Sequence, residues 1–454
     1  MPAIPSSKPR PPLPDGPFLV VGLARSGVAA AEALVARGER VYGTDSGNPS
    51  AAARLAGLGV EVELDGDGTE LLDRVSAVIK SPGVPQEAPV VAAARERGMP
   101  VIGELELGWR LLPNRFVAVT GTNGKTTVAE WLGHVWREAG ESVAVAGNVG
   151  TPLASLAEQL DPGATVVCEC SSFQLEDSVA FAPEVAVLLN FSPDHLDRHG
   201  TLDAYLDAKL RIFANQGADD FAVVDADEAA AAGAELPGDG AGARFGIAAC
   251  AAGGCLVRFG DGAIEDIDGP LIATSELPLA GEHNVRNAMA VATAALSAGI
   301  GRESVIRGLR GFAGVPHRLE RVASIGGLSF VNDSKATNVA AAAAALRSFD
   351  GGVRAILGGS LKGGSFEGLA SAVEERCTGC YLIGEAAPQL ATDLAGTGVP
   401  LHPAGDLSLA VALAALEAKA GEVVLLAPAC ASFDAFRDYE QRGERFRELV
   451  EELG

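Results

Sequence analysis

Basic residues are scarce in this chain of 454 residues. Its 35 Lys and Arg stand against 59 Asp and Glu, which gives a formal net charge of −24. Proteins that bind the nucleic-acid backbone rely on clustered Lys and Arg, so this balance argues against such a partner. We therefore expect no nucleic-acid partner, and we expect any bound phosphate to be held at a local site.

Long apolar runs and a cysteine framework are also missing. No apolar run approaches the roughly 18–20 residues that span a bilayer, and the proline-rich residues 1–16 lack the apolar core of a signal peptide. The seven cysteines are odd in number, which fits a reducing compartment better than a disulfide framework. Cys377 and Cys380 have metal or redox spacing, but no second such pair accompanies them, which favours structural thiols. We expect a cytoplasmic protein without membrane contact.

Short apolar runs alternate with Ala-, Leu- and Glu-rich helical stretches from Phe18 onward. "FLVVG", "GVAAAEALVARG" and "RVYGTD" form the first series, and the alternation restarts at "RFVAVT" and again after "GLSFVND". This order is typical of parallel sheets with helical crossovers. It predicts the α/β fold class.

The length divides this pattern into domains, because a single core stops growing near roughly 250–300 residues. We predict three domains after a disordered leader of residues 1–16. They are a Rossmann-like N-terminal domain (17–106), a central domain with a P-loop ATPase-type parallel sheet (107–314) and a Rossmann-like C-terminal domain (315–454). The Gly-rich segment from about 217 to 278 predicts an irregular or antiparallel appendage of the central domain.

The segment "VTGTNGKTT", residues 119–127, follows a strand and opens a helix, as a phosphate-binding loop does. Inward-facing backbone N–H groups and the helix N-terminus favour an anion, Lys125 can reach a terminal phosphate, and the Thr126 hydroxyl suits Mg²⁺. The general pattern requires Gly at position 119, where this chain has Val119. The loop is therefore a variant whose first glycine is Gly121.

The first strand and turn, "VVGLARSG", resemble a dinucleotide-binding turn with Gly22 and Gly27. Asp45 ends the next strand, where a ribose contact is expected. The central glycine that lets a pyrophosphate approach closely is replaced by Ala24. With an ATP loop downstream, this turn favours a nucleotide-linked substrate over a nicotinamide cofactor, although simple packing of a Rossmann-like turn stays an alternative.

Polar side chains follow two further strands. Glu169 ends "ATVVCE", and Asp194 and His195 follow "EVAVLLNFSP". Ligand sites in open α/β sheets gather beyond the carboxyl ends of strands, so these groups are expected near the phosphate loop, where Mg²⁺ would require oxygen ligands. Each could instead be a solvated loop residue. Lys209, in the helical "LDAYLDAKLRIF", is by pattern alone an exposed helix lysine.

The second half of the chain adds candidate nucleotide contacts. Asn284 and Asn287 lie one helical turn apart in "GEHNVRNA", where two amides can contact an adenine edge or merely cap the helix. Arg318 in "PHRLE" presents a fork of donors suited to a transferring phosphate. Further polar candidates follow two strands, in "NDSKATN" and "PACASFDAF".

Together these segments resemble the Mur ligase family, and the similarity covers nearly the whole chain from about Phe18. "GTNGKTT", "GEHNVRNA", "PHRLE" and "NDSKATN" are family motifs and occur in the expected order, while "SSFQLE" and "PACASFDAF" are similar to the member that adds D-glutamate. The resemblance implies an ATP- and Mg²⁺-dependent amide ligase. Its substrates would be UDP-N-acetylmuramoyl-L-alanine and D-glutamate, its intermediate an acyl phosphate, and its working form a monomer.

The resemblance also implies roles for single residues. ATP would be held by Gly121, Thr122, Asn123, Gly124, Lys125, Thr126, Thr127, Asn284, Asn287, Arg318, Asp333 and Lys335. The uridine diphosphate end would lie against Ser26, Asp45, Ser46, Gly83 and Asn148, and D-glutamate against Thr337, Lys362, Ser432 and Tyr439. The metal ligands would be Thr126, Glu169, His195 and a carbamylated Lys209. The catalytic residues would be Lys125, His195, Lys209 and Arg318.

Three alternatives remain open from the sequence. A sister ligase, such as the L-alanine-adding member or a folylpolyglutamate synthase, would differ in the amino acid that supports ATP turnover. A nicotinamide-dependent dehydrogenase built on the first turn would bind NADH. A nucleotide-binding regulator would bind ATP without forming an amide.

Overall fold

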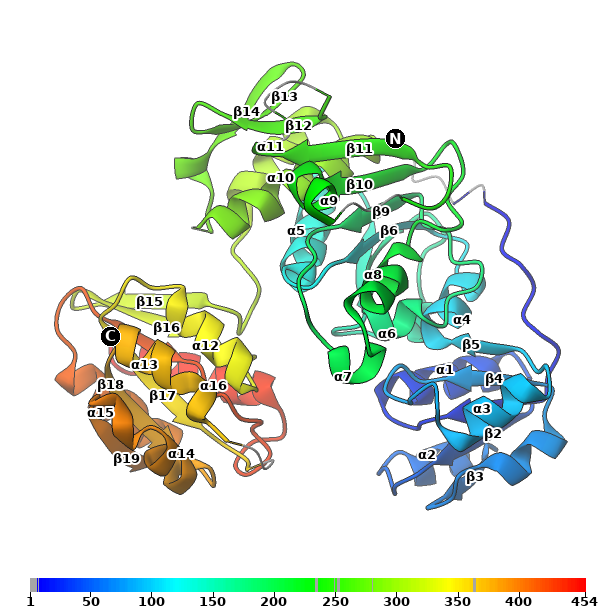
Figure 1. Ribbon diagram of the computed structural model, residues 1–454, viewed down its shortest axis with the longest axis horizontal. Helices are drawn as coiled ribbons and strands as arrows, with labels where there is room; N and C mark the ends of the chain where they lie inside the picture. The colour runs from blue at the N-terminus through cyan, green and yellow to red at the C-terminus, as the bar shows by residue number, and fades with distance from the viewer. Residues whose placement is uncertain are drawn as a thin grey trace. The chain divides into compact units, whose positions relative to one another are not determined.

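The structure is a computed structural model, and it describes residue 6 and residues 8–232, 236–248, 250, 254–279, 281–361 and 365–454. The chain divides into two compact units, Met1–Ala313 and Gly314–Gly454. Strands and helices alternate through both units, and the strands form three sheets (Figure 1). This arrangement confirms the α/β class.

The first sheet has five parallel strands in the order β3-β2-β1-β4-β5. This order is that of the first five strands of a Rossmann fold, whose ligands bind beyond the carboxyl ends of the strands. The central strands are buried over their whole length, as expected where helices cover both faces. The elements are β1 (Phe18–Val21), α1 (Arg25–Ala36), β2 (Val41–Asp45), α2 (Ala52–Gly57), β3 (Glu61–Leu64), η1 (Thr69–Arg74), β4 (Ala77–Lys80), α3 (Pro89–Glu96) and β5 (Val101–Gly103).

The second sheet has nine strands in the order β14-β13-β12-β11-β10-β9-β6-β8-β7. Its parallel part begins at β7 and places β6 between β8 and β9, so the carboxyl ends of these three strands share one edge. The elements are α4 (Glu104–Leu111), β6 (Arg115–Thr120), α5 (Lys125–Glu138), β7 (Val143–Gly147), η2 (Leu153–Leu156), β8 (Thr165–Glu169), α6 (Ser172–Leu175), β9 (Val185–Leu188), α7 (Leu196–His199), α8 (Leu202–Leu210), α10 (Glu282–Ser297) and α11 (Arg302–Gly311).

The segment expected to be an irregular or antiparallel appendage is in fact part of this sheet. The expectation was wrong for β10 (Phe221–Asp225) and β11 (Ala241–Gly246), which continue the parallel order because α9 (Ala226–Ala232) provides a crossover between them. Only β12 (Val257–Gly260), β13 (Ala263–Asp266), β14 (Gly269–Ala273) and the short helix η3 (Thr274–Glu276) form the antiparallel end that the glycines predicted.

A disulfide joins Cys250 and Cys255 in this region. This bond was not predicted, because an odd number of cysteines pointed to free thiols. The bond closes a short local loop and is no framework, since the other five cysteines, including Cys377 and Cys380, are free.

The third sheet, in the unit Gly314–Gly454, has the order β15-β16-β20-β17-β18-β19, and only its β15–β16 pair is antiparallel. Three of its helices begin at residues whose side chains accept an N–H of the first turn, Asn338, Asp406 and Asp438. The elements are β15 (Glu320–Ile325), β16 (Leu328–Asn332), α12 (Val339–Arg347), β17 (Val353–Gly358), η4 (Glu367–Leu369), α13 (Ala370–Arg376), β18 (Cys377–Ile383), α14 (Ala387–Asp393), η5 (Ala395–Thr397), β19 (Leu401–Gly405), α15 (Leu407–Glu417), β20 (Val423–Leu426) and α16 (Tyr439–Glu451).

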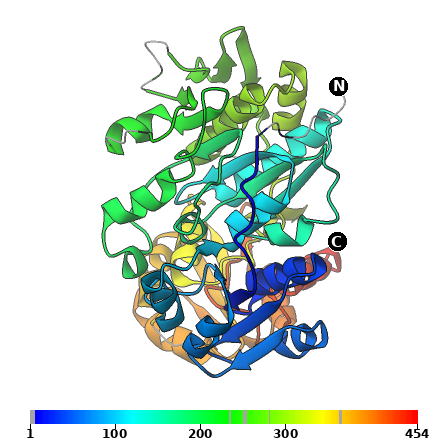
Figure 2. The same ribbon diagram turned by 90° about the vertical axis from the view of Figure 1, so that its right-hand side faces the viewer.

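The amino-terminal segment has no helix or strand in its described residues, but it packs along the first unit (Figure 2). Lys8 forms an ion pair of 2.7 Å with Asp220. The guanidinium of Arg10 lies 4.2 Å from the ring centre of Trp109 and donates to the carbonyls of Leu112 and Asn114. Lys8 and Arg10 therefore hold the described part of this segment to the elements that follow it.

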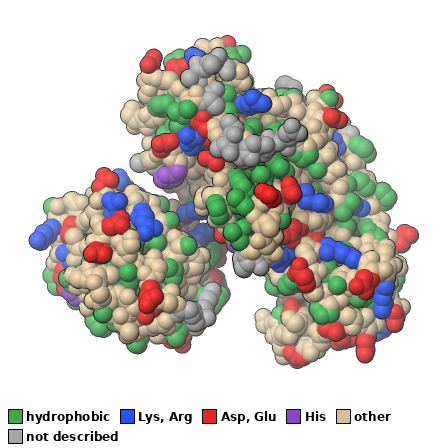
Figure 3. Space-filling view, in the orientation of Figure 1, with side chains coloured by type: hydrophobic (Ala, Val, Ile, Leu, Met, Phe, Trp, Pro, Cys, Tyr) green, Lys and Arg blue, Asp and Glu red, His purple; other side chains and the backbone are tan. Residues whose placement is uncertain are grey.

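On the face that Figure 3 shows, acidic and basic side chains are interspersed over each unit, and neither sign of charge forms a continuous patch. Within the described part of the chain, no helix is both long enough and apolar enough to cross a membrane.

Candidate active site

The phosphate loop joins β6 to α5, and two of its glycines adopt conformations that side chains rarely reach. Gly121 has φ 153° and Gly124 has φ 82°. A Cβ at Gly124 would lie 2.6 Å from Oδ1 of Asn287, so the loop and α10 are in close contact. The structure thus brings two parts of the predicted ATP site together, although 163 residues separate them in the sequence.

Lys125 folds back over its own loop. Its Nζ donates to the carbonyl of Gly121 at 3.0 Å and to that of Thr122 at 2.9 Å. Thr126 and Thr127 follow in the first turn of α5 and are buried. A cation and a helix N-terminus therefore meet at one place, which suits a phosphate.

Asn190, which the sequence analysis missed, holds the loop from the next strand. Its Oδ1 accepts the N–H of Asn123 at 2.9 Å, its Nδ2 donates to the carbonyl of Asn123, and its own carbonyl accepts the N–H of Thr122. The available signal was its position directly after the apolar run "VAVLL", since β9 lies beside β6 in the sheet.

Lys209 is buried, whereas its sequence pattern alone indicated an exposed helix lysine. It is 1% exposed, and its Nζ donates to the carbonyl of Gly121 at 2.8 Å. Burial, reinforced by the nearby charge of Lys125, lowers the pKa of Lys209 to about 7. A substantial fraction of its amine is therefore neutral near pH 7.

Tyr205 lies between this lysine and His195 and was also missed. Its ring centre is 4.5 Å from Lys209 Nζ and 6.4 Å from the His195 ring, and its hydroxyl is 3.3 Å from the Thr122 hydroxyl. His195 has a left-handed backbone (φ 50°), and its half-exposed ring lies 3.5 Å from Asp194. Lys209, Tyr205 and His195 thus follow one another outward from the phosphate loop.

Glu169 ends β8 at the same edge of the sheet. Its side chain is 3% exposed, and its Oε1 accepts an N–H of the Asn148 side chain at 3.0 Å. Asn148 was assigned to the uridine diphosphate end from the resemblance, but its side chain donates to this candidate metal ligand.

The adenine candidates lie at the start of α10. The Asn287 side chain donates to Oδ1 of Asn284 at 3.2 Å, so the two amides do face each other. Arg286, between them, pairs with Asp225 at 2.8 Å and Asp227 at 3.0 Å and anchors the helix to the end of β10. The sequence analysis missed this anchor because its acidic partners are about 60 residues away.

A carboxylate at the end of β2 contacts the backbone of the first turn. Asp45 Oδ2 accepts the N–H of Leu23 at 2.7 Å, and its Oδ1 accepts that of Gly47 at 2.9 Å. Ser26 lies in the first turn of α1, and Ser46 and Gly83 are exposed on neighbouring loops. These four candidates gather at the carboxyl edge of the first sheet, on β2 and on the connections that follow β1, β2 and β4.

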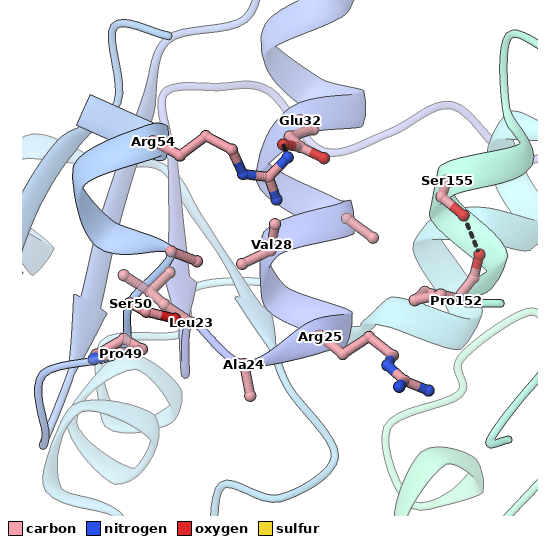
Figure 4. Close-up of a pocket in the computed structure, with 12 residues that line it drawn as sticks. Leu23, Ala24, Arg25, Val28, Glu32, Pro49, Ser50, Arg54, Pro152 and Ser155 are labelled. Carbon is pink, nitrogen blue, oxygen red and sulfur yellow. Dashed lines mark hydrogen bonds and ion pairs between the residues drawn. The ribbon is translucent and has the colours of Figure 1, made fainter. Parts of the chain in front are cut away.

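A cavity of about 410 Å³ opens beside this turn (Figure 4). Arg25 lines it and donates to the carbonyl of Gly150, while Arg54 pairs with Glu32 across it. None of the four candidates Ser26, Asp45, Ser46 and Gly83 lines this cavity. Its wall consists of Leu23, Ala24, Arg25, Val28, Ala29, Glu32, Pro49, Ser50, Ala51, Arg54, Pro152 and Ser155.

In the unit Gly314–Gly454, Asp333, Lys335 and Thr337 follow β16, and Ser432 follows the neighbouring strand β20. Asp333 Oδ1 accepts the N–H of Leu319, and burial raises the pKa of Asp333 to about 6. Arg318 precedes β15, and Ser432 is buried. Lys335 Nζ is 6.0 Å from the Tyr439 ring centre. Lys362 lies outside the described residues.

Arg442, missed by the sequence analysis, joins the two loops of this unit. It is 1% exposed, donates to the hydroxyl and carbonyl of Ser334, and donates to the carbonyls of Cys430 and Ala431. An arginine in a helical "EQRGERF" segment gave no sign of burial, because its partners are backbone carbonyls from distant loops.

Three family models match successive parts of the chain. The Mur ligase MurD-like N-terminal domain matches residues 17–103, the Mur ligase middle domain matches 119–295, and the Mur ligase glutamate ligase domain matches 317–430. Helix α4 spans the boundary that we expected between residues 106 and 107, and it lies between the first two matches.

Curated relatives match over nearly the full length. The UDP-N-acetylmuramoylalanine--D-glutamate ligase of Acidobacterium capsulatum is 44% identical over 440 residues, which cover 95% of each chain. The ligase of the same name from Geobacter metallireducens is 43% identical over 444 residues, 96% of this chain and 97% of its own.

Solved structures share the fold at lower identity. The UDP-N-acetylmuramate-alanine ligase MurC of Thermotoga maritima has a TM-score of 0.59 and 20% identity, and the match covers 97% of this chain and all of that one. E. coli FolC, in complex with DHPP and ADP, has a TM-score of 0.52 and 18% identity over 76% of this chain and 91% of its own. With three successive domain matches and relatives above 40% identity along almost its whole length, this chain belongs to the Mur ligase family.

Proposed function

We propose that the protein joins D-glutamate to UDP-N-acetylmuramoyl-L-alanine at the expense of ATP, in the synthesis of peptidoglycan precursors. The observation that carries this proposal is the buried Lys209 beside a phosphate loop, in a chain more than 40% identical to ligases of that name. The fold alone would not select among the ligases, since structures of several of them share it.

The reaction needs ATP because a carboxylate is an unreactive electrophile with a poor leaving group. The carboxylate oxygen of the alanyl end attacks the γ-phosphorus, and the bond from that phosphorus to ADP breaks. The amine of D-glutamate then attacks the carbonyl carbon of the acyl phosphate. The tetrahedral intermediate releases inorganic phosphate and a proton and leaves the amide.

The phosphate loop would bind and orient the triphosphate. The N–H groups at the N-terminus of α5 would donate to phosphate oxygens, and Lys125 would exchange its bonds to the carbonyls of Gly121 and Thr122 for the β- and γ-phosphates. Such positioning supplies most of the catalysis in phosphoryl transfer, because the protein adds little covalent chemistry of its own.

The donors at this edge of the sheet fit a Mg²⁺ ion that arrives with the nucleotide. Within the described residues, no three His, Cys, Asp or Glu side chains form a metal site by themselves. Mg²⁺ commonly takes one or two protein carboxylates and completes its shell with phosphates and water. The buried Glu169 and the Thr126 hydroxyl suit that role, and His195 and a modified Lys209 would complete the protein ligands. Bound Mg²⁺ would neutralise phosphate charge.

Carbamylation of Lys209 is chemically favoured by its surroundings. Only a neutral amine adds to CO₂, forming an N–C bond and releasing a proton, and the pKa of Lys209 is lowered to about 7 by burial. The product is an anionic oxygen donor, whereas an ammonium group would repel a metal ion. The buried position beside Gly121 would then place a carboxylate-like group next to the phosphates.

The remaining assignments stay proposals. Asn284 and Asn287 would contact adenine, Arg318 the γ-phosphate, and Asp333 and Lys335 the nucleotide. The uridine diphosphate end would lie against Ser26, Asp45, Ser46, Gly83 and Asn148, and D-glutamate against Thr337, Lys362, Ser432 and Tyr439. We also propose that the enzyme works as a monomer in the cytoplasm, where ATP and UDP-linked substrates are available.

The test is phosphate release by the purified protein with ATP, Mg²⁺ and UDP-N-acetylmuramoyl-L-alanine. We expect turnover with D-glutamate and none with L-glutamate, L-alanine or meso-diaminopimelate. Turnover with another amino acid alone would assign the chain to a sister ligase. No turnover with any of them would refute the proposal.

A further inference from the structure

A buried ion pair joins the first sheet to the helical segment that follows Glu169. Lys80 ends β4 and is 0% exposed, and its Nζ lies 2.8 Å from Oδ2 of Asp177, whose side chain is 1% exposed. Asp177 follows α6, so the pair joins residues 97 positions apart. Charges are rarely buried this completely unless they are paired, and removing one partner is strongly destabilising.

The same lysine holds the loop that follows β4. Lys80 Nζ donates to the carbonyl of Val84 at 2.8 Å and lies 3.5 Å from that of Ser81. The Ser81 hydroxyl donates to the carbonyl of Gly22 at 2.6 Å, so this loop lies directly against the first turn. Gly83, a candidate contact of the UDP-linked substrate, is the exposed residue in the middle of the clamped loop.

A second cation reaches this loop from the central sheet. Arg198 Nη2 donates to the carbonyl of Val84 at 3.1 Å and to Oε2 of Glu176 at 3.1 Å. Arg198 lies in α7, three residues after His195. The Val84 carbonyl therefore accepts from two cations, one on the strand before the loop and one on the segment that carries His195.

We propose that Lys80, Asp177 and Arg198 are positioning residues that fix the Ser81–Val84 loop to the segments bearing Glu169 and His195, and so set where the acceptor end of the UDP-linked substrate lies relative to the phosphate loop. This inference rests on the proposed function. None of the three residues needs to touch the reacting atoms, because they act through the carbonyl of Val84.

A double variant tests the proposal without leaving a lone buried charge. In Lys80→Met/Asp177→Leu both charges are replaced by apolar side chains of similar size, a change that is often neutral for stability. We expect the KM for UDP-N-acetylmuramoyl-L-alanine to rise about tenfold or more, since small misplacements of a substrate have large effects. The KM for ATP should change less than twofold. The single variant Asp177→Glu keeps the carboxylate. Its KM for UDP-N-acetylmuramoyl-L-alanine should therefore be much closer to the wild-type value than that of the double variant.

The matched control is Lys8→Met/Asp220→Leu. This pair also joins distant segments of the first unit at 2.7 Å, but it contacts no loop of the substrate site. The control should leave both KM values unchanged. A folded Lys80→Met/Asp177→Leu protein with an unchanged KM for the UDP-linked substrate would overturn the proposal and leave the pair a structural feature.

Arg198→Met decides the question if the double variant does not fold. It removes one donor to Val84 and leaves the buried pair intact, so we expect a threefold or greater rise in the same KM, and an unchanged value would overturn the proposal. Calorimetric binding of the UDP-linked substrate to the wild type separates the two hypotheses. A wild type that neither binds it nor ligates D-glutamate contradicts the proposed function, whereas an active wild type with unaffected variants contradicts only the positioning role.

Discussion

The first turn and the phosphate loop occupy the same place in their sheets, and both helices begin at a cation, but the contacts of the charged side chains differ. Each turn follows a buried strand through a glycine with positive φ, Gly22 in one and Gly121 in the other. In the first, the Asp45 carboxylate accepts the N–H of Leu23. In the second, the Lys125 ammonium covers two carbonyls of the loop.

Under the proposed function, this difference would let one architecture bind two different nucleotides. A carboxylate at the turn accepts from hydroxyl and ring N–H groups, which a nucleoside offers. A lysine at a helix N-terminus attracts phosphates. The backbone geometry is therefore not sufficient to assign a ligand, and the side chains that contact each turn have to be compared.

Lys125→Met should have the largest effect, because it removes the cation that would bind the β- and γ-phosphates. We expect kcat/KM to fall by about a thousandfold or more, the order seen when a preorganised donor to a reacting group is lost. Phosphate release measures the change, and Lys419→Met, at an exposed site of the other unit, serves as the control. Activity within tenfold of the wild type would contradict the role of Lys125.

Lys209→Ala should have the next largest effect. It would show whether catalysis at the phosphate loop depends on the buried lysine beside it. We expect kcat to fall on the order of a hundredfold, as for a lost general or electrostatic catalyst, while fluorescent ATP-analogue binding stays within threefold. Added acetate or formate should partly restore the rate by supplying the missing carboxylate. Wild-type activity in the variant would remove Lys209 from the site.

Asp45→Asn should affect only the first turn. Hydrogen bonds to charged groups contribute about 1.5–3 kcal/mol, so we expect the KM for the UDP-linked substrate to rise about tenfold, with the KM for ATP unchanged. Asp67→Asn, which alters an exposed carboxylate of the same unit, is the control. A rise in the KM for ATP instead would show that the two turns are not separate sites.

A last effect, on stability and not on catalysis, is expected where α4 contacts η2. Glu104 is 1% exposed, its Oε1 accepts the N–H of Ala154 at 2.7 Å, and burial raises the pKa of Glu104 to about 7. Because this value is above that of the unfolded chain, about 4.3, its stabilisation is complete below about pH 4 and is lost as the pH rises through 7. Relative to Glu104→Gln, the wild type should lose at most about 1.4 kcal/mol of unfolding free energy per pH unit.

Urea unfolding at pH 5, 6, 7 and 8 measures this difference, since the two proteins share every other titrating group. A constant difference between them across that range would show that Glu104 titrates like an exposed carboxylate.

The two turns also show how far sequence reasoning reaches. The phosphate loop is encoded by contiguous residues with fixed conformational and charge requirements, so its place between strand and helix was predictable. Lys209 was not predictable from its helix, because burial of a lysine depends on the packing of α8 against a loop 88 residues earlier. Asn190 and Arg442 were not predicted for the same reason, since each side chain forms hydrogen bonds with backbone groups that are distant in the sequence.

The amino-terminal segment has a consequence for optical work on this protein. Trp109 is 2% exposed and lies beneath the guanidinium of Arg10. Proteolytic trimming of residues 1–16 would uncover this indole, and an indole that enters water emits at longer wavelength. Intrinsic fluorescence would therefore reveal a clipped amino end in a preparation whose sheets remain intact.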